Sequence, residues 1–155
     1  MNATPVIAVL VGPLADHAPG GESLLQKAIA GEPETRIHVI AVDTSPANLR
    51  FRPAIVVPDR LTRFLRRLGL EAWVRALAGS PAGRLINSIG PLDPGRVVWR
   101  SLRGDREARR LLEGSDLLIA ADSTAVMAAW HARRRHWVGE ARFDPRAREF
   151  LAAEH

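Results

Sequence analysis

The feature that most constrains this chain is an uninterrupted apolar run at residues 6–11, followed by a glycine-containing loop at residues 12–21 and an amphipathic stretch at residues 22–30. The run has no polar alternation, so a strand formed by it would be covered on both faces, as in a parallel sheet between two layers of helices. The loop would open at the carboxyl end of that strand, where open α/β sheets bind their ligands. This order predicts an α/β domain with a ligand site after its first strand.

The rest of the chain repeats the alternation of strand and helix. We expect further strands at residues 37–42, 54–57, 96–101, 116–121 and 136–140. We expect helices at residues 22–30, 60–78, 105–112 and 146–153, and another that begins after Asp122 and Ser123. Gly69 can bend or break the helix at 60–78, and residues 79–95 are expected to be mostly loop. With no internal repeat or linker, the pattern predicts one domain over residues 1–155, a three-layer, doubly wound, mostly parallel, Rossmann-like sheet.

The composition excludes cysteine chemistry and argues against a membrane span. The 155 residues are 46% hydrophobic and include no cysteine, which excludes disulfides, thiolate metal sites and cysteine nucleophiles and is compatible with a reducing compartment. No apolar run approaches the ~20 residues of a membrane span, and the first residues lack the pattern of a signal peptide. We therefore expect a cytoplasmic protein, with peripheral contact to a membrane left open.

The chain is arginine-rich. It has 22 basic against 17 acidic residues, a net charge of +5, and Lys27 is its single lysine. Such a skew is a common product of GC-rich codons, and the arginines are dispersed without a nucleic-acid-binding motif, so we do not expect a nucleic-acid partner. Solvated helix faces and a surface for anionic membranes or other polyanions remain the two explanations of the charge.

Candidate ligand-binding residues follow the first predicted strand. Gly12 ends that strand, and Gly20, Gly21 and Glu22 lead into the first helix. Glycines at this place let backbone amides approach a phosphate or carboxylate at the positive end of the helix. The alternative is an ordinary flexible turn, since the loop does not spell a dinucleotide-binding or P-loop motif.

Other candidates follow two later strands. Asp43 ends the predicted strand at residues 37–42, where related folds hold ribose hydroxyls, although with the residues after it Asp43 also makes an ordinary turn. Asp122, Ser123 and Thr124 follow the predicted strand at residues 116–121. They are candidates for ligand contact, and the first two also suit the N-cap of a helix.

Two segments resemble a known family. Pro19, Gly20, Gly21 and Glu22 after an apolar strand, together with SDLLIAADSTAVMAAWHARRR at residues 115–135, resemble the N-terminal, acceptor-side half of GT-B glycosyltransferases. The resemblance implies a sugar acceptor as ligand and no cofactor of the domain's own. Because the family holds its sugar nucleotide on a second domain, it also implies a donor-binding partner chain or domain. This chain lacks the histidine that many relatives carry after the strand at 116–121.

The resemblance also implies a catalytic pair. His17 occupies the place of a general base toward the acceptor hydroxyl, and Asp122 the place of the carboxylate that orients it. A histidine titrates near neutrality, and a carboxylate on its second nitrogen stabilises the imidazolium that forms. The alternative is that His17 is a solvated loop residue and Asp122 caps a helix. No other histidine has the spacing of a metal ligand, so no metal is expected.

The helix predicted at residues 60–78 carries an apolar face that includes Phe64, Leu68 and Trp73, flanked by arginines. In acceptor-side GT-B domains such a helix often rests on anionic lipid, where arginine and tryptophan favour the interface. The alternative is that this apolar face packs on the sheet as part of the core.

Two further classes of function remain. The stretch VIAVDTSPANL at residues 39–49 resembles S-adenosylmethionine-dependent methyltransferases, in which the residue at Asp43 would hold the ribose of S-adenosylmethionine, but the expected glycine-rich turn after the first strand is missing. A non-catalytic binding or assembly module, including a homo-oligomer, is the other class. Its anchors would be Trp73, Trp99, Trp130 and Trp137, either in the core or on a partner-facing surface.

Overall fold

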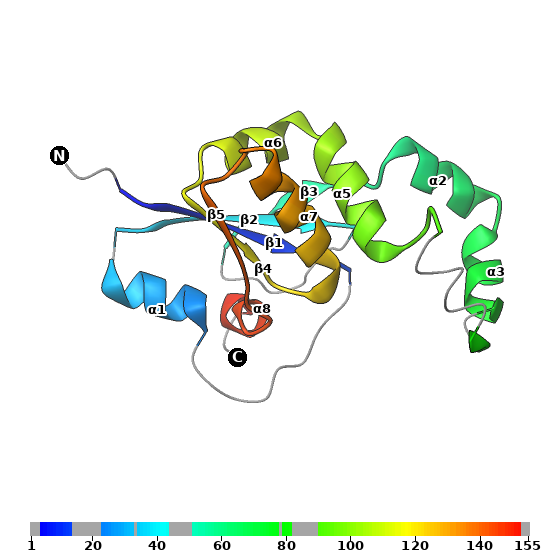
Figure 1. Ribbon diagram of the computed structural model, residues 1–155, viewed down its shortest axis with the longest axis horizontal. Helices are drawn as coiled ribbons and strands as arrows, with labels where there is room; N and C mark the ends of the chain where they lie inside the picture. Colours follow the sequence, from blue (N-terminus) through cyan, green and yellow to red (C-terminus); the bar gives the residue numbers. More distant parts are fainter. Residues whose placement is uncertain are drawn as a thin grey trace.

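A parallel sheet forms the centre of the computed structural model, which describes residues 4–13, 23–32, 34–43, 51–77, 79–81 and 90–152 (Figure 1). The sheet has five strands in the order β3-β2-β1-β4-β5, and every described pairing is parallel. The strands are β1 (Val6–Val11), β2 (Arg36–Val42), β3 (Ala54–Val56), β4 (Leu117–Ala120) and β5 (Glu140–Phe143).

Helices cover both faces of this sheet (Figure 1). They are α1 (Leu24–Gly31), α2 (Arg60–Arg67), α3 (Leu70–Leu77), α5 (Pro94–Gly104), α6 (Arg106–Glu113), α7 (Ser123–Arg134) and α8 (Ala147–Leu151). Leu25 of α1 and Leu151 of α8 share a buried cluster with one face of β1, whereas α5, α6 and α7 share another with the opposite face. The chain therefore has a three-layer, doubly wound, Rossmann-like α/β fold, as the sequence predicted.

The strand order creates a topological switch point between β1 and β4. From β1 the chain moves to β2 on one side, and from β4 it moves to β5 on the other side. Ligands of open α/β sheets bind at such a point, beyond the carboxyl ends of the strands. The candidate site therefore lies where β1 and β4 end.

Two predicted elements differ in the structure. The strand predicted at residues 96–101 is wrong, because these residues belong to α5. Asp93 accepts a hydrogen bond from the Arg96 amide at 3.0 Å and Pro94 occupies the first turn, so the two residues start a helix there. Its buried side chains, Val97, Val98, Trp99, Ser101 and Leu102, recur at helical spacing.

The second difference concerns the last strand, which was predicted at residues 136–140 and is β5 at Glu140–Phe143. His136 adopts a left-handed conformation with φ 57° after α7, so the chain turns there instead of extending.

The helix predicted at 60–78 is divided at Gly69. α2 ends before Gly69, whose φ of 72° is left-handed, and α3 begins after it.

The tryptophans divide between core and surface. Trp99 and Trp137 are buried, whereas Trp73 and Trp130 are exposed.

His131 of α7 stacks on Trp99 with ring centroids 4.7 Å apart and meets the edge of Trp130 at 4.8 Å. Partial burial and the neighbouring Arg135 and Arg134 lower the pKa of His131 below its ordinary value.

We expect His131 to make the folded state sensitive to acid. Because the pKa of His131 is lower in the folded chain than in the unfolded chain, the unfolded chain takes up the proton first. The free energy of unfolding should therefore fall as the pH drops below about 6.5. Urea titrations at several pH values should show this fall in the wild type and a flatter profile in His131→Gln.

The exposed His136 provides the control for this experiment. His136→Asn keeps a residue that tolerates a left-handed backbone and should retain the wild-type pH profile. An unchanged profile in His131→Gln would show that His131 does not couple folding to pH.

Candidate functional site

The ends of β1 and β4 meet through one hydrogen-bonded carboxylate. The Gly12 amide donates to Asp122 Oδ2 at 2.6 Å, and the amides of Thr124 and Ala125 both donate to Asp122 Oδ1 at 3.1 Å. The Thr124 hydroxyl donates to the same Oδ1. Asp122 is fully buried. The expected N-cap role of Asp122 is confirmed, and the same side chain also holds the end of β1.

A cation from α8 approaches this carboxylate. Arg148 Nη1 lies 3.7 Å from Asp122 Oδ2 and donates a long hydrogen bond of 3.4 Å to the Gly12 carbonyl oxygen. The sequence analysis did not identify Arg148 as a site residue. Its position depends on where β5 returns the chain to the sheet, and no local pattern encodes that path.

Gly12 is required by close packing at this point. A Cβ atom added to Gly12 would lie 2.0 Å from Thr124 Oγ1 and 2.7 Å from Asp122 Oδ1. These distances are far inside van der Waals contact, so no other residue fits without moving the first turn of α7. The glycine therefore serves the junction of β1 with α7.

A second carboxylate caps α1. Asp144 Oδ2 accepts hydrogen bonds from the Ser23 hydroxyl and the Leu24 amide, both at 2.7 Å, while Ser23 Oγ accepts from the Leu25 amide. Asp144 Oδ1 also accepts from the Arg146 amide at 3.2 Å, just before α8. We refer to Asp122 and Asp144 as the capping carboxylates, because they occupy the N-termini of α7 and α1.

Asp43 at the end of β2 is paired with a cation. Arg66 of α2 donates Nη1 to Asp43 Oδ1 at 2.7 Å and Nη2 to Asp43 Oδ2, and its Nε donates to Glu71 Oε1 at 2.7 Å. Hydrogen bonding to Asp43 raises the pKa of Arg66 above its ordinary value. Both oxygens that would receive ribose hydroxyls are therefore bound to a guanidinium.

Asp59 ties α2 to α5. Its carboxylate accepts from the Leu61 amide at 2.9 Å, from the Thr62 hydroxyl at 2.6 Å and from Arg100 Nε at 3.2 Å. Partial burial raises the pKa of Asp59, but the hydrogen bonds from Thr62 and the Arg100 charge outweigh burial and hold that pKa below its usual value. This contact and the Asp43–Arg66 pair fix α2 beside the carboxyl ends of β2 and β3.

The remaining predicted site residues fall into two groups. His17, Gly20, Gly21 and Glu22 lie outside the described residues, so the pairing of His17 with Asp122 stays a prediction. Of the helix-start candidates, Thr124 is buried against Asp122, whereas Ser123 is exposed. The structure thus brings Gly12, Asp122 and Thr124 together.

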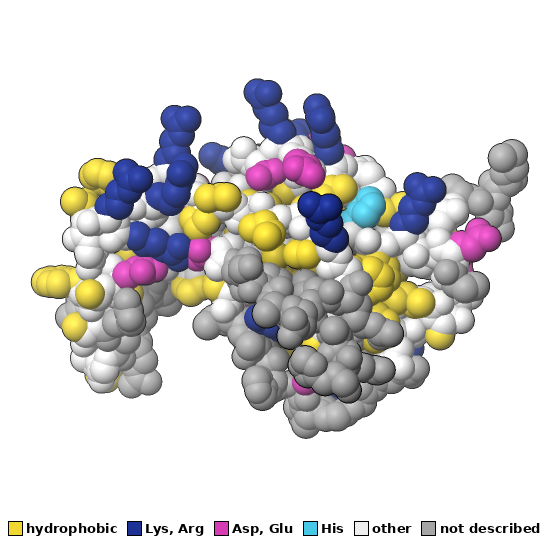
Figure 2. All heavy atoms as spheres, turned by 180° about the vertical axis from the view of Figure 1, so that it is seen from behind, with side chains coloured by type: hydrophobic (Ala, Val, Ile, Leu, Met, Phe, Trp, Pro, Cys, Tyr) yellow, Lys and Arg dark blue, Asp and Glu magenta, His cyan; other side chains and the backbone are white. Residues whose placement is uncertain are grey.

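Three large apolar side chains on or between α2 and α3 face solvent. The exposed fractions of Phe64, Leu68 and Trp73 are 57%, 60% and 70%. The alternative that these residues pack on the sheet is therefore wrong. Figure 2 shows arginine and hydrophobic side chains side by side over the lobe that α2 and α3 form, at its left.

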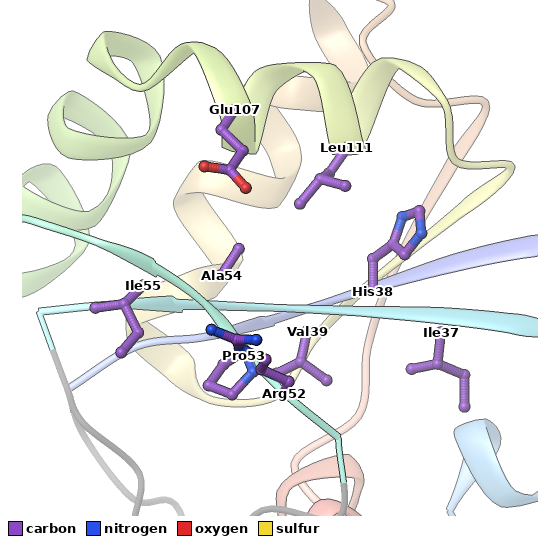
Figure 3. A pocket seen from close by; sticks show the side chains of 9 residues that line it. All are labelled: Ile37, His38, Val39, Arg52, Pro53, Ala54, Ile55, Glu107 and Leu111. Atoms are coloured by element: carbon purple, nitrogen blue, oxygen red, sulfur yellow. The ribbon is translucent and has the colours of Figure 1, made fainter.

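A hollow of about 580 Å³ lies beside the amino half of β2, where β3 has not yet begun. Figure 3 shows His38 rising from β2 toward α6, while Glu107 and Leu111 point down from α6 into the same space. His38 Nδ1 is buried and has no hydrogen-bond partner among the described residues. The sequence analysis did not identify this hollow. The hollow exists because the edge strand β3 is short and leaves the amino half of β2 without a neighbouring strand on that side.

Among the described residues, no three His, Asp or Glu side chains gather as a metal site. Within these parts of the chain, no helix combines the length and apolar character that a membrane crossing requires.

Comparison with known proteins adds no family to these observations. No family model matches the chain, and neither the curated proteins nor the solved structures include a significant match. The resemblance to GT-B glycosyltransferases therefore stays a prediction from the residues quoted above.

We expect Gly12→Ala to destabilise the fold strongly. The added methyl group collides with Thr124 Oγ1 and with the buried Asp122 carboxylate, and overpacking of this kind costs about 3 kcal/mol. Urea denaturation measures the loss. Gly104→Ala is the matched control, because a Cβ on this last residue of α5 meets nothing within 4 Å. Equal stability of the two variants would contradict the close packing at Gly12.

Proposed function

We propose that this chain is the acceptor-side half of a glycosyl-transfer system and holds no nucleotide by itself. The observation that carries the proposal is the pair of capping carboxylates, Asp122 and Asp144, on the helix N-termini that border the switch point. In nucleotide-binding α/β domains a helix N-terminus receives a phosphate. Here protein carboxylates take that place, and their negative charge repels a phosphate.

A neutral, hydroxyl-bearing ligand suits such a site better than a nucleotide. Such a ligand carries no charge for the capping carboxylates to repel, and its hydroxyl oxygens can accept from Arg148, whose side chain is 25% exposed beside the fully buried Asp122. In the proposed reaction His17 takes the proton of the acceptor hydroxyl as that oxygen attacks the sugar. The partner chain or domain supplies the sugar nucleotide and retains the nucleoside diphosphate that leaves.

The methyltransferase alternative is less favoured. It needs the Asp43 carboxylate to accept the two ribose hydroxyls of S-adenosylmethionine, and both Asp43 oxygens accept from Arg66. A cofactor would have to displace a two-point ion pair, which is among the stronger charge-assisted contacts in proteins.

Ligand binding by the purified chain tests the proposal. We expect no thermal shift with a uridine diphosphate sugar, a dinucleotide or S-adenosylmethionine. A nucleotide at about 100 times its dissociation constant would add about 2.7 kcal/mol and raise the midpoint by several degrees. Saturation-transfer NMR with methyl glycosides of glucose, galactose, mannose and N-acetylglucosamine should show contact with at least one sugar.

Variants of two histidines refine this test. His17→Ala should weaken the glycoside signal, and His136→Asn, in the turn after α7, should leave it unchanged. A nucleotide that stabilises the chain contradicts the proposal. Glycosides that bind equally well to His17→Ala would remove His17 from the acceptor site.

A second candidate function is attachment to an anionic membrane. It is favoured by the exposed side chains Phe64, Leu68 and Trp73, which lie on or between α2 and α3 together with the exposed Arg63 and Arg67. An amphipathic surface of this composition binds where aromatic rings enter the headgroup region and arginines meet anionic lipid. This surface would bring the switch point close to a lipid-borne acceptor.

Vesicle cosedimentation tests the membrane candidate. We expect binding to phosphatidylcholine vesicles that contain phosphatidylglycerol, weaker binding in high salt, and little binding to phosphatidylcholine alone. Replacing Phe64 and Trp73 with Ser should reduce binding about tenfold, whereas Trp130→Ser, on the distant α7, should not. Equal binding to both kinds of vesicle, or none to either, would contradict this candidate.

A further inference from the structure

The outer edge of β5 presents backbone groups that have no partner among the described residues. The Glu140 amide donates to the Asp116 carbonyl at 3.1 Å and the Asp144 amide donates to the Ala120 carbonyl at 2.9 Å. Backbone groups alternate in direction along a parallel strand, so those of Ala141 and Phe143 point away from β4. β5 is the last strand of the described sheet on this side. Such an edge is a template for pairing with another strand.

An apolar groove runs along this edge. Its volume is about 220 Å³, and its lining includes Val126 and Trp130 of α7 and Ala141 and Phe143 of β5. The exposed fractions are 53% for Trp130 and 48% for Phe143. An exposed apolar groove beside an unpaired strand edge indicates a protein–protein contact.

The two faces of β5 differ in character. Ala141 packs against the core on the α7 side, and Phe143 lines the groove on that side as well. Alternation directs the side chains of Glu140 and Arg142 toward the opposite face, where they form an exposed ion pair of 2.7 Å, although Arg142 also borders the groove between Ala141 and Phe143. The strand thus carries apolar groups on one face and one charge of each sign on the other.

We propose that the edge of β5 pairs with β5 of a second copy of this chain, antiparallel about a two-fold axis at Ala141, so that one sheet continues through both copies. In this register the outward groups of Ala141 bond to those of Ala141 in the second copy. Phe143 pairs with Gly139 of the second copy. Glu140 lies opposite Arg142 of the second copy, and the symmetry repeats this ion pair.

Other registers are less favourable. An axis at Glu140 or at Arg142 would place like charges directly opposite each other, which destabilises a strand pair. An axis at Phe143 would place Ala141 opposite Pro145, which has no amide hydrogen to donate. An axis between two residues would oppose an outward-facing residue to an inward-facing one. The charge pattern and the hydrogen-bond pattern therefore select the same register.

The helices above the strands fit this arrangement. α7 packs over both β4 and β5. With strands about 4.8 Å apart, the α7 helices of the two copies would lie about two strand spacings, or 10 Å, from each other. Packed helices are separated by about 8–10 Å. Trp130 and Phe143 of each copy would then be covered by α7 of the other. Arg133, which also lines the groove, has a long side chain that can extend into solvent.

Sedimentation velocity of the full chain over a range of concentrations tests the proposal. We expect a reversible dimer. Ala141→Pro removes an outward amide without removing a bond to β4, so the monomer should fold and the dissociation constant should rise at least about tenfold. Ile55→Pro is the matched control. Ile55 also points outward, from β3 at the opposite edge, because Val56 bonds to Asp43 of the neighbouring strand. This control should leave the dimer intact.

Charge reversal tests the register without changing the backbone. Glu140→Arg and Arg142→Glu should each weaken the dimer about tenfold, because each places like charges opposite each other twice. The double variant with both changes should restore the wild-type dissociation constant. A wild type that is monomeric at every concentration overturns the proposal. So does a dimer that resists both Ala141→Pro and the single reversals, or one that Ile55→Pro disrupts instead. The outcome does not depend on the proposed glycosyl transfer.

Discussion

The buried carboxylate of Asp122 accepts hydrogen bonds from the end of β1 and from the first turn of α7, and the switch point of the sheet is built around it. A buried charge is costly unless hydrogen bonds and an opposite charge surround it, and here three backbone amides, the Thr124 hydroxyl and Arg148 do so. The same contact explains why Gly12 has no side chain and why α7 begins where it does. The central strand pair and the longest described helix therefore depend on one side chain.

In the candidate site, the chain's own charged side chains occupy the positions where related domains bind phosphate or ribose. Asp122 and Asp144 take the helix N-termini, and Arg66 takes the carboxylate at the end of β2. Each position would serve phosphate or ribose recognition in a domain that binds its own nucleotide. The chain keeps the architecture of such domains and fills their contact points with its own charged groups. This arrangement is the physical basis for proposing a neutral ligand.

The sequence predicted the fold class well, because buried parallel strands are recognisable as continuous apolar runs and helix starts as capping residues in the local sequence. Val6–Val11 and the Asp122 cap are examples. One such signal was missed: Asp93 and Pro94 start α5, although we expected mostly loop at residues 79–95 and a strand at 96–101. The contacts of Asp43 with Arg66 and of Arg148 with Asp122 join residues far apart along the chain. No local pattern encodes such contacts, since they depend on how the helices pack against the sheet in three dimensions.

The attachment of α2 and α3 has a consequence for how this chain can diversify. Phe64, Leu68 and Trp73, on or between these helices, point outward, and α2 is joined to the rest mainly by polar contacts of Asp59 and Arg66. Changes on the outer surface of these helices leave the packing of the sheet intact. During evolution this segment can therefore exchange its surface, and with it whatever the surface touches, while the central sheet keeps its sequence.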